Sequence, residues 1–168
     1  MSTSRNTLTA TVSRYLFFSP PYEFRPREVW NAKLGRYTKR AAVTKTTVRA
    51  VAARIRQVAD FFEANPKMRC KGDLMIGHKV CAMGAVENSR KIGLTWDPTA
   101  SRNCNSRQTM NVMENMGIVD VNDSAVPNEQ FISYVRFCAD VLDAWANTGD
   151  WAGSVNKQPL AKRLKINV

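Results

Sequence analysis

Residues 44–65 read TKTTVRAVAARIRQVADFFEAN, and this stretch decides the fold. Its apolar side chains Val48, Val51, Ile55, Val58 and Phe62 follow a 3-4-3-4 spacing, which places them in one stripe along an α-helix. The threonines at its start are candidate N-caps, and the Asn-Pro pair that follows it predicts the end of the helix. We therefore expect a long amphipathic helix whose stripe faces a core.

A second stripe of the same kind lies near the end of the chain. Residues 128–146 repeat the helical spacing from Phe131 to Trp145, and the Asn-Thr-Gly sequence at 147–149 predicts the stop. We expect the two helices to pack through their stripes. The side chains predicted to be buried there are Val51, Ile55, Val58, Phe62, Phe131, Val135, Cys138 and Leu142.

Shorter elements are predicted around these two helices. Alternating residues 7–13 favour a short strand, and Trp30, Leu34 and Tyr37 at i, i+4 and i+7 favour a short helix. Turn signals within 70–80 indicate a hairpin. Further helices are expected over 81–91 and 106–116. The fold class is therefore mainly α, a single small helical domain of four to five helices with a minor β element and a basic N-terminal extension.

Charge is distributed unevenly along the chain, which carries a formal net charge of +11. Residues 1–60 hold twelve Lys/Arg and three Asp/Glu, a net of +9, whereas residues 61–145 have a net of −1 and the remainder +3. We expect a basic N-terminal extension (1–45), a helical domain (46–147) and a basic C-terminal tail (148–168). Such asymmetry indicates a polyanionic partner, most often nucleic acid, DNA or RNA.

Aromatic residues are interleaved with the basic residues of this front. Lys and Arg pair with phosphates and aromatic rings stack on bases, so the composition favours non-enzymatic nucleic-acid binding with little sequence preference. The candidate binding residues are Arg25, Arg27, Lys33, Arg36, Lys39, Arg40, Lys45, Arg49 and Arg56. The last three fall within about 40° on a helical wheel and predict a basic row off the apolar stripe. Arg54 belongs to the same run.

An acidic protein surface is the alternative partner, which would make the chain an interaction module, such as a virion component or an inhibitor of a host protein. No apolar run approaches the roughly 20 residues that span a bilayer, so no membrane partner is expected. No secretory signal is legible, so the four cysteines are expected to be reduced thiols in the cytoplasm. The oligomeric state is left open.

A thiol- or metal-dependent enzyme is the second alternative. Cys81 is expected at a helix N-terminus, where the dipole lowers a thiol pKa, and His78 lies three residues upstream. Zinc could use Cys70, His78, Cys81 and Cys104, but their spacing matches no common zinc template. Because Cys81 also opens a run of small residues that permits close packing, we assign no catalytic residue, metal or cofactor.

Two short motifs carry a family resemblance. Residues 81–85 read CAMGA, and Asn122-Asp123 precedes the last long helix, where the pair also predicts a turn. Over about 48–146 the chain resembles an uncharacterised family of small bacterial and phage domains that share a Cys-Ala-x-Gly-Ala helix start and a later Asn-Asp. The resemblance implies a compact helical domain and a phage origin, and it implies no activity.

Overall fold

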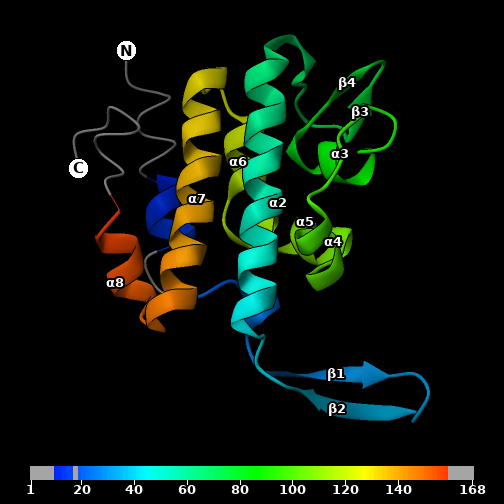
Figure 1. The fold of residues 1–168 in the computed structure, drawn as a ribbon, viewed down its shortest axis with the longest axis vertical. Coiled ribbons are helices and arrows are strands. Elements are labelled where there is room, and N and C mark those ends of the chain that lie inside the picture. Colours follow the sequence, from blue (N-terminus) through cyan, green and yellow to red (C-terminus); the bar gives the residue numbers. More distant parts are fainter. Residues whose placement is uncertain (1–9, 17–18, 159–168) are drawn as a thin grey trace.

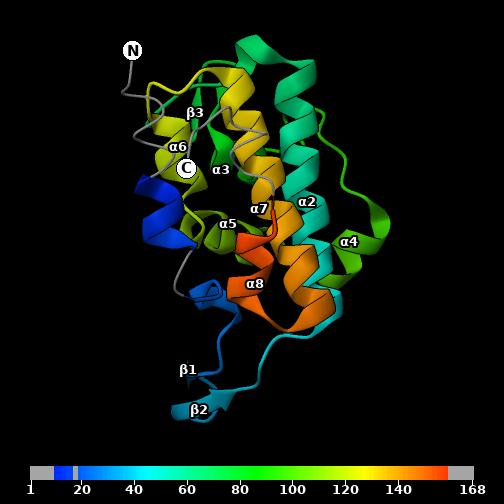
Figure 2. The same cartoon turned by 90° about the vertical axis from the view of Figure 1, so that its left-hand side faces the viewer.

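The computed structural model describes residues 10–16 and 19–158. Its centre is a pair of long helices, α2 (Lys45–Ala64) and α7 (Asn128–Thr148), which lie side by side in Figures 1 and 2. All the side chains predicted for the two stripes are fully buried, and the ring of Phe62 meets that of Phe131 edge to face at a centroid distance of 5.5 Å. The mainly helical fold and its two-helix core are therefore confirmed.

The ends of both helices follow from their local sequence. The Thr44 side chain caps α2 by accepting a hydrogen bond from the Thr47 backbone N–H at 3.2 Å, and α2 stops at Asn65, before a proline. Helix α7 stops at Gly149, whose φ of 72° is a left-handed conformation that glycine adopts without strain.

Shorter elements surround this pair. They are η1 (Tyr22–Phe24), β1 (Arg27–Asn31), β2 (Arg36–Arg40), η2 (Pro66–Met68), β3 (Met75–Ile76), β4 (Lys79–Val80), α3 (Ala82–Glu87), α4 (Pro98–Asn103), α5 (Ser106–Asn115), α6 (Ile118–Asp123) and α8 (Trp151–Asn156). Strands β1 and β2 form one antiparallel sheet, and β3 and β4 form another. The β3–β4 hairpin and helices α3 and α5 lie where the sequence predicts them, whereas α4, α6 and α8 were not predicted. The predicted number of four to five helices is therefore too low.

The strand predicted over 7–13 is wrong for its described part, because residues 10–15 are helical and the others lie outside the described residues. Val12 and Leu16, four residues apart, are both buried, and the Leu16 N–H donates to the Val12 carbonyl at 2.9 Å. The free energy gained by burying Val12 and Leu16 on one side of a helix outweighs the strand preference of the alternating apolar and polar residues.

The short helix predicted around Trp30, Leu34 and Tyr37 is also wrong, because these residues belong to the β1–β2 hairpin. The reversal is built by Asn31, whose side-chain oxygen accepts from the Leu34 N–H at 3.1 Å, and by Gly35 at a φ of 62°. Trp30 and Tyr37 face each other across the strands, so a spacing typical of a helix arises here from a turn.

The core extends beyond residues 46–147, the predicted limits of the helical domain. The prediction that the N-terminal extension and the C-terminal tail lie outside the core is therefore wrong. Val12 and Leu16 are buried on one side of these limits and Trp151 on the other. Trp151 joins them directly, since its indole N–H donates to the Leu16 carbonyl at 2.6 Å. Trp151 also packs against α7, where its ring meets that of Trp145 edge to face at a centroid distance of 5.6 Å.

The Asn122-Asp123 pair ends α6 and does not form the predicted turn. The amide of Asn122 is buried, where it accepts from the Ala82 N–H at 3.2 Å and donates to the Cys70 carbonyl at 3.0 Å. Asp123 accepts from the Gly72 N–H at 2.9 Å. The pair thus ties α6 to α3 and to the loop before β3.

Replacing Gly84 by alanine is expected to destabilise the protein by about 1–3 kcal/mol or more, as overpacking does. A Cβ at this position would collide with the backbone carbonyl of Leu74, which cannot rotate away as a side chain could. Glu87→Ala on the exposed end of the same helix is the control and should change stability by less than about 0.5 kcal/mol. Urea unfolding measures both, and equal values would contradict the close packing of α3.

Candidate nucleic-acid interface

The β1–β2 hairpin projects from the helical body in both views (Figures 1 and 2). Trp30 and Tyr37 lie opposite each other in its register, with ring centroids 5.4 Å apart in an edge-to-face arrangement. The two side chains remain 59% and 65% exposed. The hairpin therefore presents a pair of aromatic rings to solvent.

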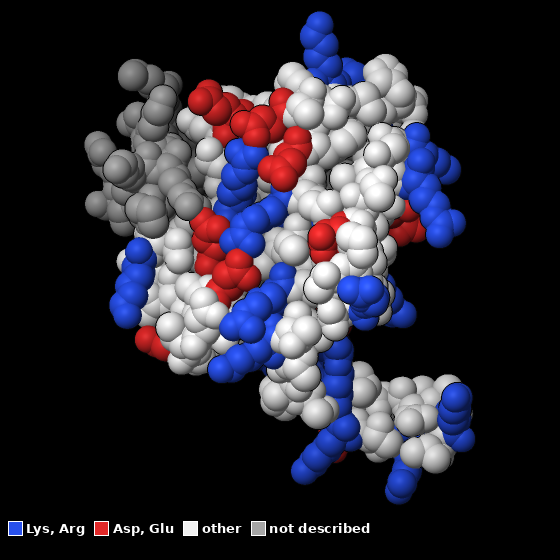
Figure 3. Space-filling model, viewed as in Figure 1, with Lys and Arg blue, Asp and Glu red and all other residues white. Residues whose placement is uncertain are grey.

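Basic side chains surround these rings. Lys39 lies two residues from Tyr37 and so shares its face of the hairpin, while Lys33 lies in the turn and Arg36 directly follows it. Within the described part of the chain, none of these three cations lies within ion-pairing distance of a carboxylate. Figure 3 shows basic atoms spaced along the hairpin, whereas over α2 and α7 basic and acidic atoms are intermixed.

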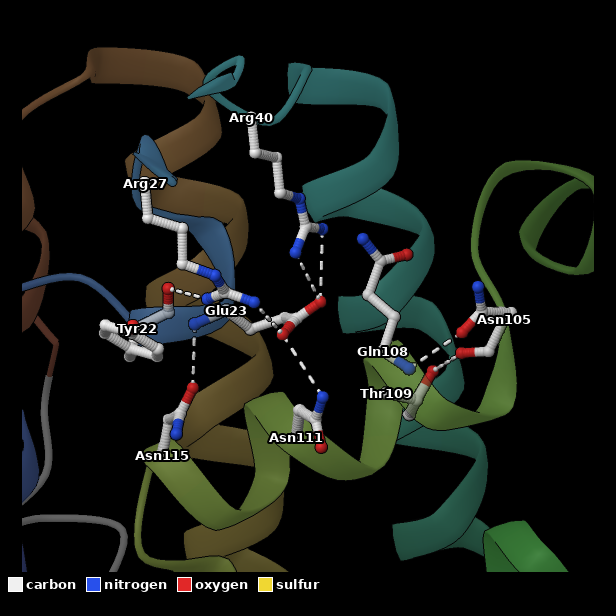
Figure 4. Close-up of polar contacts among 9 residues, drawn as sticks. All are labelled: Tyr22, Glu23, Arg27, Arg40, Asn105, Gln108, Thr109, Asn111 and Asn115. Carbon is white, nitrogen blue, oxygen red and sulfur yellow. Dashed lines mark hydrogen bonds and ion pairs between the residues drawn. The ribbon is translucent and has the colours of Figure 1, made fainter. Parts of the chain in front are cut away.

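A single carboxylate fixes the base of the hairpin (Figure 4). Glu23 accepts hydrogen bonds from Arg27 at 3.1 Å, from both terminal nitrogens of Arg40 at 3.1 Å and from the Asn111 amide at 3.2 Å. Its backbone N–H donates to the Asn115 side chain at 2.9 Å. Since Arg27 and Arg40 are paired across the strands, Glu23 ties both strands to η1 and α5.

Glu23 is held in its charged form. Its side chain is only 8% exposed, and this burial alone would raise its pKa. Hydrogen bonds from Arg27, Asn111 and Arg40 outweigh burial, so the pKa of Glu23 lies below its ordinary value. Arg27 and Arg40, predicted as phosphate contacts, thus serve first to orient the hairpin. Together with the negative charge of Glu23, these two arginines leave a net charge of +1.

The basic row predicted on α2 is interrupted. Arg56 forms ion pairs with Asp140 at 2.6 Å and Asp143 at 2.5 Å on α7. Burial alone would lower the pKa of Arg56, but the two carboxylates raise it. Arg49 instead donates to the Asn147 side chain at 2.6 Å, and Lys45 lies exposed in the first turn. Arg56 is therefore a bridge between helices.

Arg25 occupies an intermediate position between body and hairpin. Its guanidinium donates to the Pro20 carbonyl at 2.9 Å and the Ser19 hydroxyl at 2.6 Å, and it lies 6.0 Å from the centre of the Tyr22 ring. The nine predicted residues thus form no single surface. Lys33, Arg36 and Lys39 lie together on the projecting hairpin, and the others lie at its base or along α2.

Sequence reasoning missed Glu23 as the organiser of this region. The only signal for it is that Glu23 is one of three acidic residues in a front of twelve basic ones, where a carboxylate finds arginine partners readily. Asn111 and Asn115 carry no such signal, because helix α5 brings them to Glu23 only in the folded chain.

Cys81, the candidate nucleophile of the enzyme alternative, is buried. Cys81 caps α3, and its sulfur accepts from the Gly84 N–H at 3.3 Å. Burial raises the pKa of Cys81 above its ordinary value, despite backbone hydrogen bonds that oppose the rise. His78 is exposed in the β3–β4 turn, and no group of three or more His, Cys, Asp or Glu in residues 10–16 and 19–158 is arranged to hold a metal ion.

In the same described ranges, no helix combines the length and the apolar character needed to cross a membrane. Comparison of the chain with models of known protein families, with curated proteins and with solved structures found no match. The family resemblance over residues 48–146 and the phage origin stay predictions.

Proposed function

We propose that the protein binds nucleic acid through the β1–β2 hairpin, with unpaired strands as its preferred form. The observation that carries this proposal is the exposed Trp30–Tyr37 pair, flanked by the cations of Lys33, Arg36 and Lys39. Bases stack on aromatic rings whatever their identity, and phosphates pair with Lys and Arg, so the combination suits binding with little sequence preference. The basic front of the chain would then act as a binding arm.

The fixed base of the hairpin supports the same proposal. Ordering a flexible segment on binding costs conformational entropy, which reduces affinity. Glu23 holds both strands through Arg27 and Arg40, so the base of the hairpin that carries the aromatic rings is fixed before a ligand arrives. A virus-encoded accessory protein that acts in the cytoplasm of its host would fit such an activity.

An acidic protein surface is the second candidate partner. Leu34 in the turn of the hairpin is 57% exposed and apolar, and Trp30 and Tyr37 belong to the residue types that are enriched at protein interfaces. Salt dependence separates the two partners, because release of counterions from nucleic acid makes the affinity fall linearly with salt on logarithmic axes.

Binding to a fluorescent single strand of mixed sequence, followed by anisotropy at several salt concentrations, tests the proposal. If four phosphates are neutralised, log K should fall against log salt with a slope of about −3. Trp30→Ala/Tyr37→Ala should weaken binding by about 10- to 100-fold while leaving that slope unchanged, since it removes stacking and no charge.

Lys33→Ala/Arg36→Ala/Lys39→Ala should flatten the slope by about two, because three phosphate contacts are lost. The matched control removes three exposed cations from another part of the molecule, Lys67, Lys71 and Lys79, and should leave the slope almost unchanged. An equal loss in both triple variants would show that only net charge matters. A wild-type protein that binds neither single strand nor duplex at low salt would refute nucleic acid as the partner.

A further inference from the structure

A cavity of about 610 Å³ lies apart from the hairpin, where α2 faces the loop before α4 and the start of α5. Its lining includes Arg54, Ser89, Arg90, Trp96, Ser101 and Ser106. Of the described residues, no Asp or Glu lines it, although two arginines do. A cavity of this size lies within the range of small-molecule sites, which is about 300–1,000 Å³.

Arg54 is the unusual residue of this cavity, because its side chain is a buried charge. Only 5% of the residue is exposed, and its guanidinium lies over the Trp96 ring, 4.9 Å from the ring centre. It donates to the hydroxyls of Ser106 at 3.3 Å and Ser101 at 3.5 Å, both long contacts. Its Nε is buried and has no hydrogen-bond partner in the described part of the chain.

A counter-charge for Arg54 is also missing. Among the described residues, no Asp or Glu lies within ion-pairing distance of its guanidinium, whereas Arg56, two residues later on the same helix, has two such partners. Removing a charge from water without a compensating charge is costly, and buried charges in proteins are as a rule paired. Two neutral hydroxyls and an aromatic ring compensate only part of that cost.

We propose that this cavity binds a phosphate monoester, whose phosphate supplies the missing counter-charge. The guanidinium of Arg54 matches two oxygens of a phosphate, and Ser101 and Ser106 are placed to donate hydroxyl protons to the same group. Arg90 adds a second positive charge at the cavity wall. Ser106 also opens α5, whose N-terminal dipole favours an anion.

Phosphate fits this site better than a carboxylate does. A phosphate monoester dianion offers three terminal oxygens and two negative charges to two arginines and several hydroxyls, whereas a carboxylate offers two oxygens and a single charge. The volume left beside the phosphate, with Trp96 as one wall, suits the organic part of the ester. The source of the phosphate is either a free small ester or the terminal phosphate of a strand.

Thermal unfolding of the full chain tests the site. The probes are inorganic phosphate and a nucleoside monophosphate, compared with sodium chloride of equal ionic strength. Each should raise the melting temperature, by about 8 °C at a hundredfold excess over its Kd, and the nucleoside without phosphate should not. Oligonucleotides with a 5′-phosphate and with a 5′-hydroxyl form the second arm. If only the 5′-phosphorylated one of the two oligonucleotides raises the melting temperature, the site binds strand ends. If the nucleoside monophosphate raises it and neither oligonucleotide does, the site binds small esters.

Arg54→Met is the decisive variant, and Arg102→Met, an exposed arginine of α4 outside the cavity, is its control. Arg54→Met should lose the phosphate-dependent shift and melt higher than wild type in chloride, because an uncompensated buried charge is gone. Arg102→Met should keep the shift. Phosphate also stabilises proteins generally by exclusion from their surfaces, so the difference between the two variants is the quantity that counts.

Ser101→Glu provides a second route should Arg54→Met fail to fold. A carboxylate beside the guanidinium would occupy the anion position from within the chain, so this variant should melt higher in chloride and ignore phosphate. A phosphate shift that persists in Ser101→Glu or in folded Arg54→Met would overturn the proposal, as would a wild type indifferent to both probes. The hairpin variants should keep the full shift, so this site and the hairpin can fail independently.

Discussion

Replacing Phe62 by alanine is expected to lower the free energy of unfolding by about 3–5 kcal/mol. The Phe62 side chain is fully buried between α2 and α7 and meets the rings of Phe61 and Phe131 edge to face at 5.2 and 5.5 Å. Truncation removes these contacts and leaves a cavity that two packed helices can close only in part.

Urea unfolding followed by far-ultraviolet circular dichroism measures this loss. Phe61→Ala is the matched control, because it removes the same atoms from the neighbouring residue, which is only half-buried. It should cost clearly less, since a partly exposed ring gives up less burial and leaves no enclosed cavity. Equal losses in the two variants would contradict the helix pair as the centre of the fold.

Glu23→Gln is expected to lower the free energy of unfolding by about 2 kcal/mol. Glutamine keeps the shape of the side chain but leaves Arg27 and Arg40 without a counter-charge in a site where Glu23 is mostly buried. The hairpin should lose its fixed orientation, so its strand amides should exchange hydrogen faster. Both arginines are themselves partly exposed, which keeps the loss below that of a fully buried ion pair.

The pH dependence gives this prediction a sign. The pKa of Glu23 is lower in the folded protein than its ordinary value of 4.5, so its contribution to stability is complete above that value. As the pH falls through the folded pKa, the carboxylate takes up a proton and the contribution disappears. The stability difference between wild type and Glu23→Gln should therefore shrink on acidification below about pH 4.5.

Glu28→Gln is the control for both experiments, because Glu28 lies on the same hairpin but is exposed, opposite Lys39. It should change stability by less than about 0.5 kcal/mol. If it matched Glu23→Gln in stability and in hydrogen exchange, the carboxylate at the base of the hairpin would have no special role.

The long helices could be predicted because their apolar stripes repeat over several turns, and burial of such a stripe leaves few alternatives. The hairpin could not, because Trp30, Leu34 and Tyr37 satisfy the helical period by coincidence while Asn31 and Gly35 specify a turn. Short segments of this kind are decided by one or two turn residues, which periodicity does not detect.

The candidate site, too, could be predicted from the sequence only in part. Sequence alone places the basic residues in the front of the chain, but it does not show which of them keep a free charge. Arg56 is neutralised by Asp140 and Asp143, which lie far along the chain on α7. Arg54, two residues earlier, is buried with no such partner among the described residues. Only the packed structure distinguishes these two arginines.

The pairing of α2 with α7 also bears on how the chain acquires its structure during synthesis. All of residues 65–127 lie between the two helices, so α2 leaves the ribosome long before the helix that shields its apolar stripe exists. Contacts of high sequence separation slow folding, and an unshielded stripe is prone to aggregation in the meantime. Of this pair, the helix that is synthesised first must therefore wait until residue 148 has been made before its stripe is covered, and that interval is when a chaperone would be of most use to this protein.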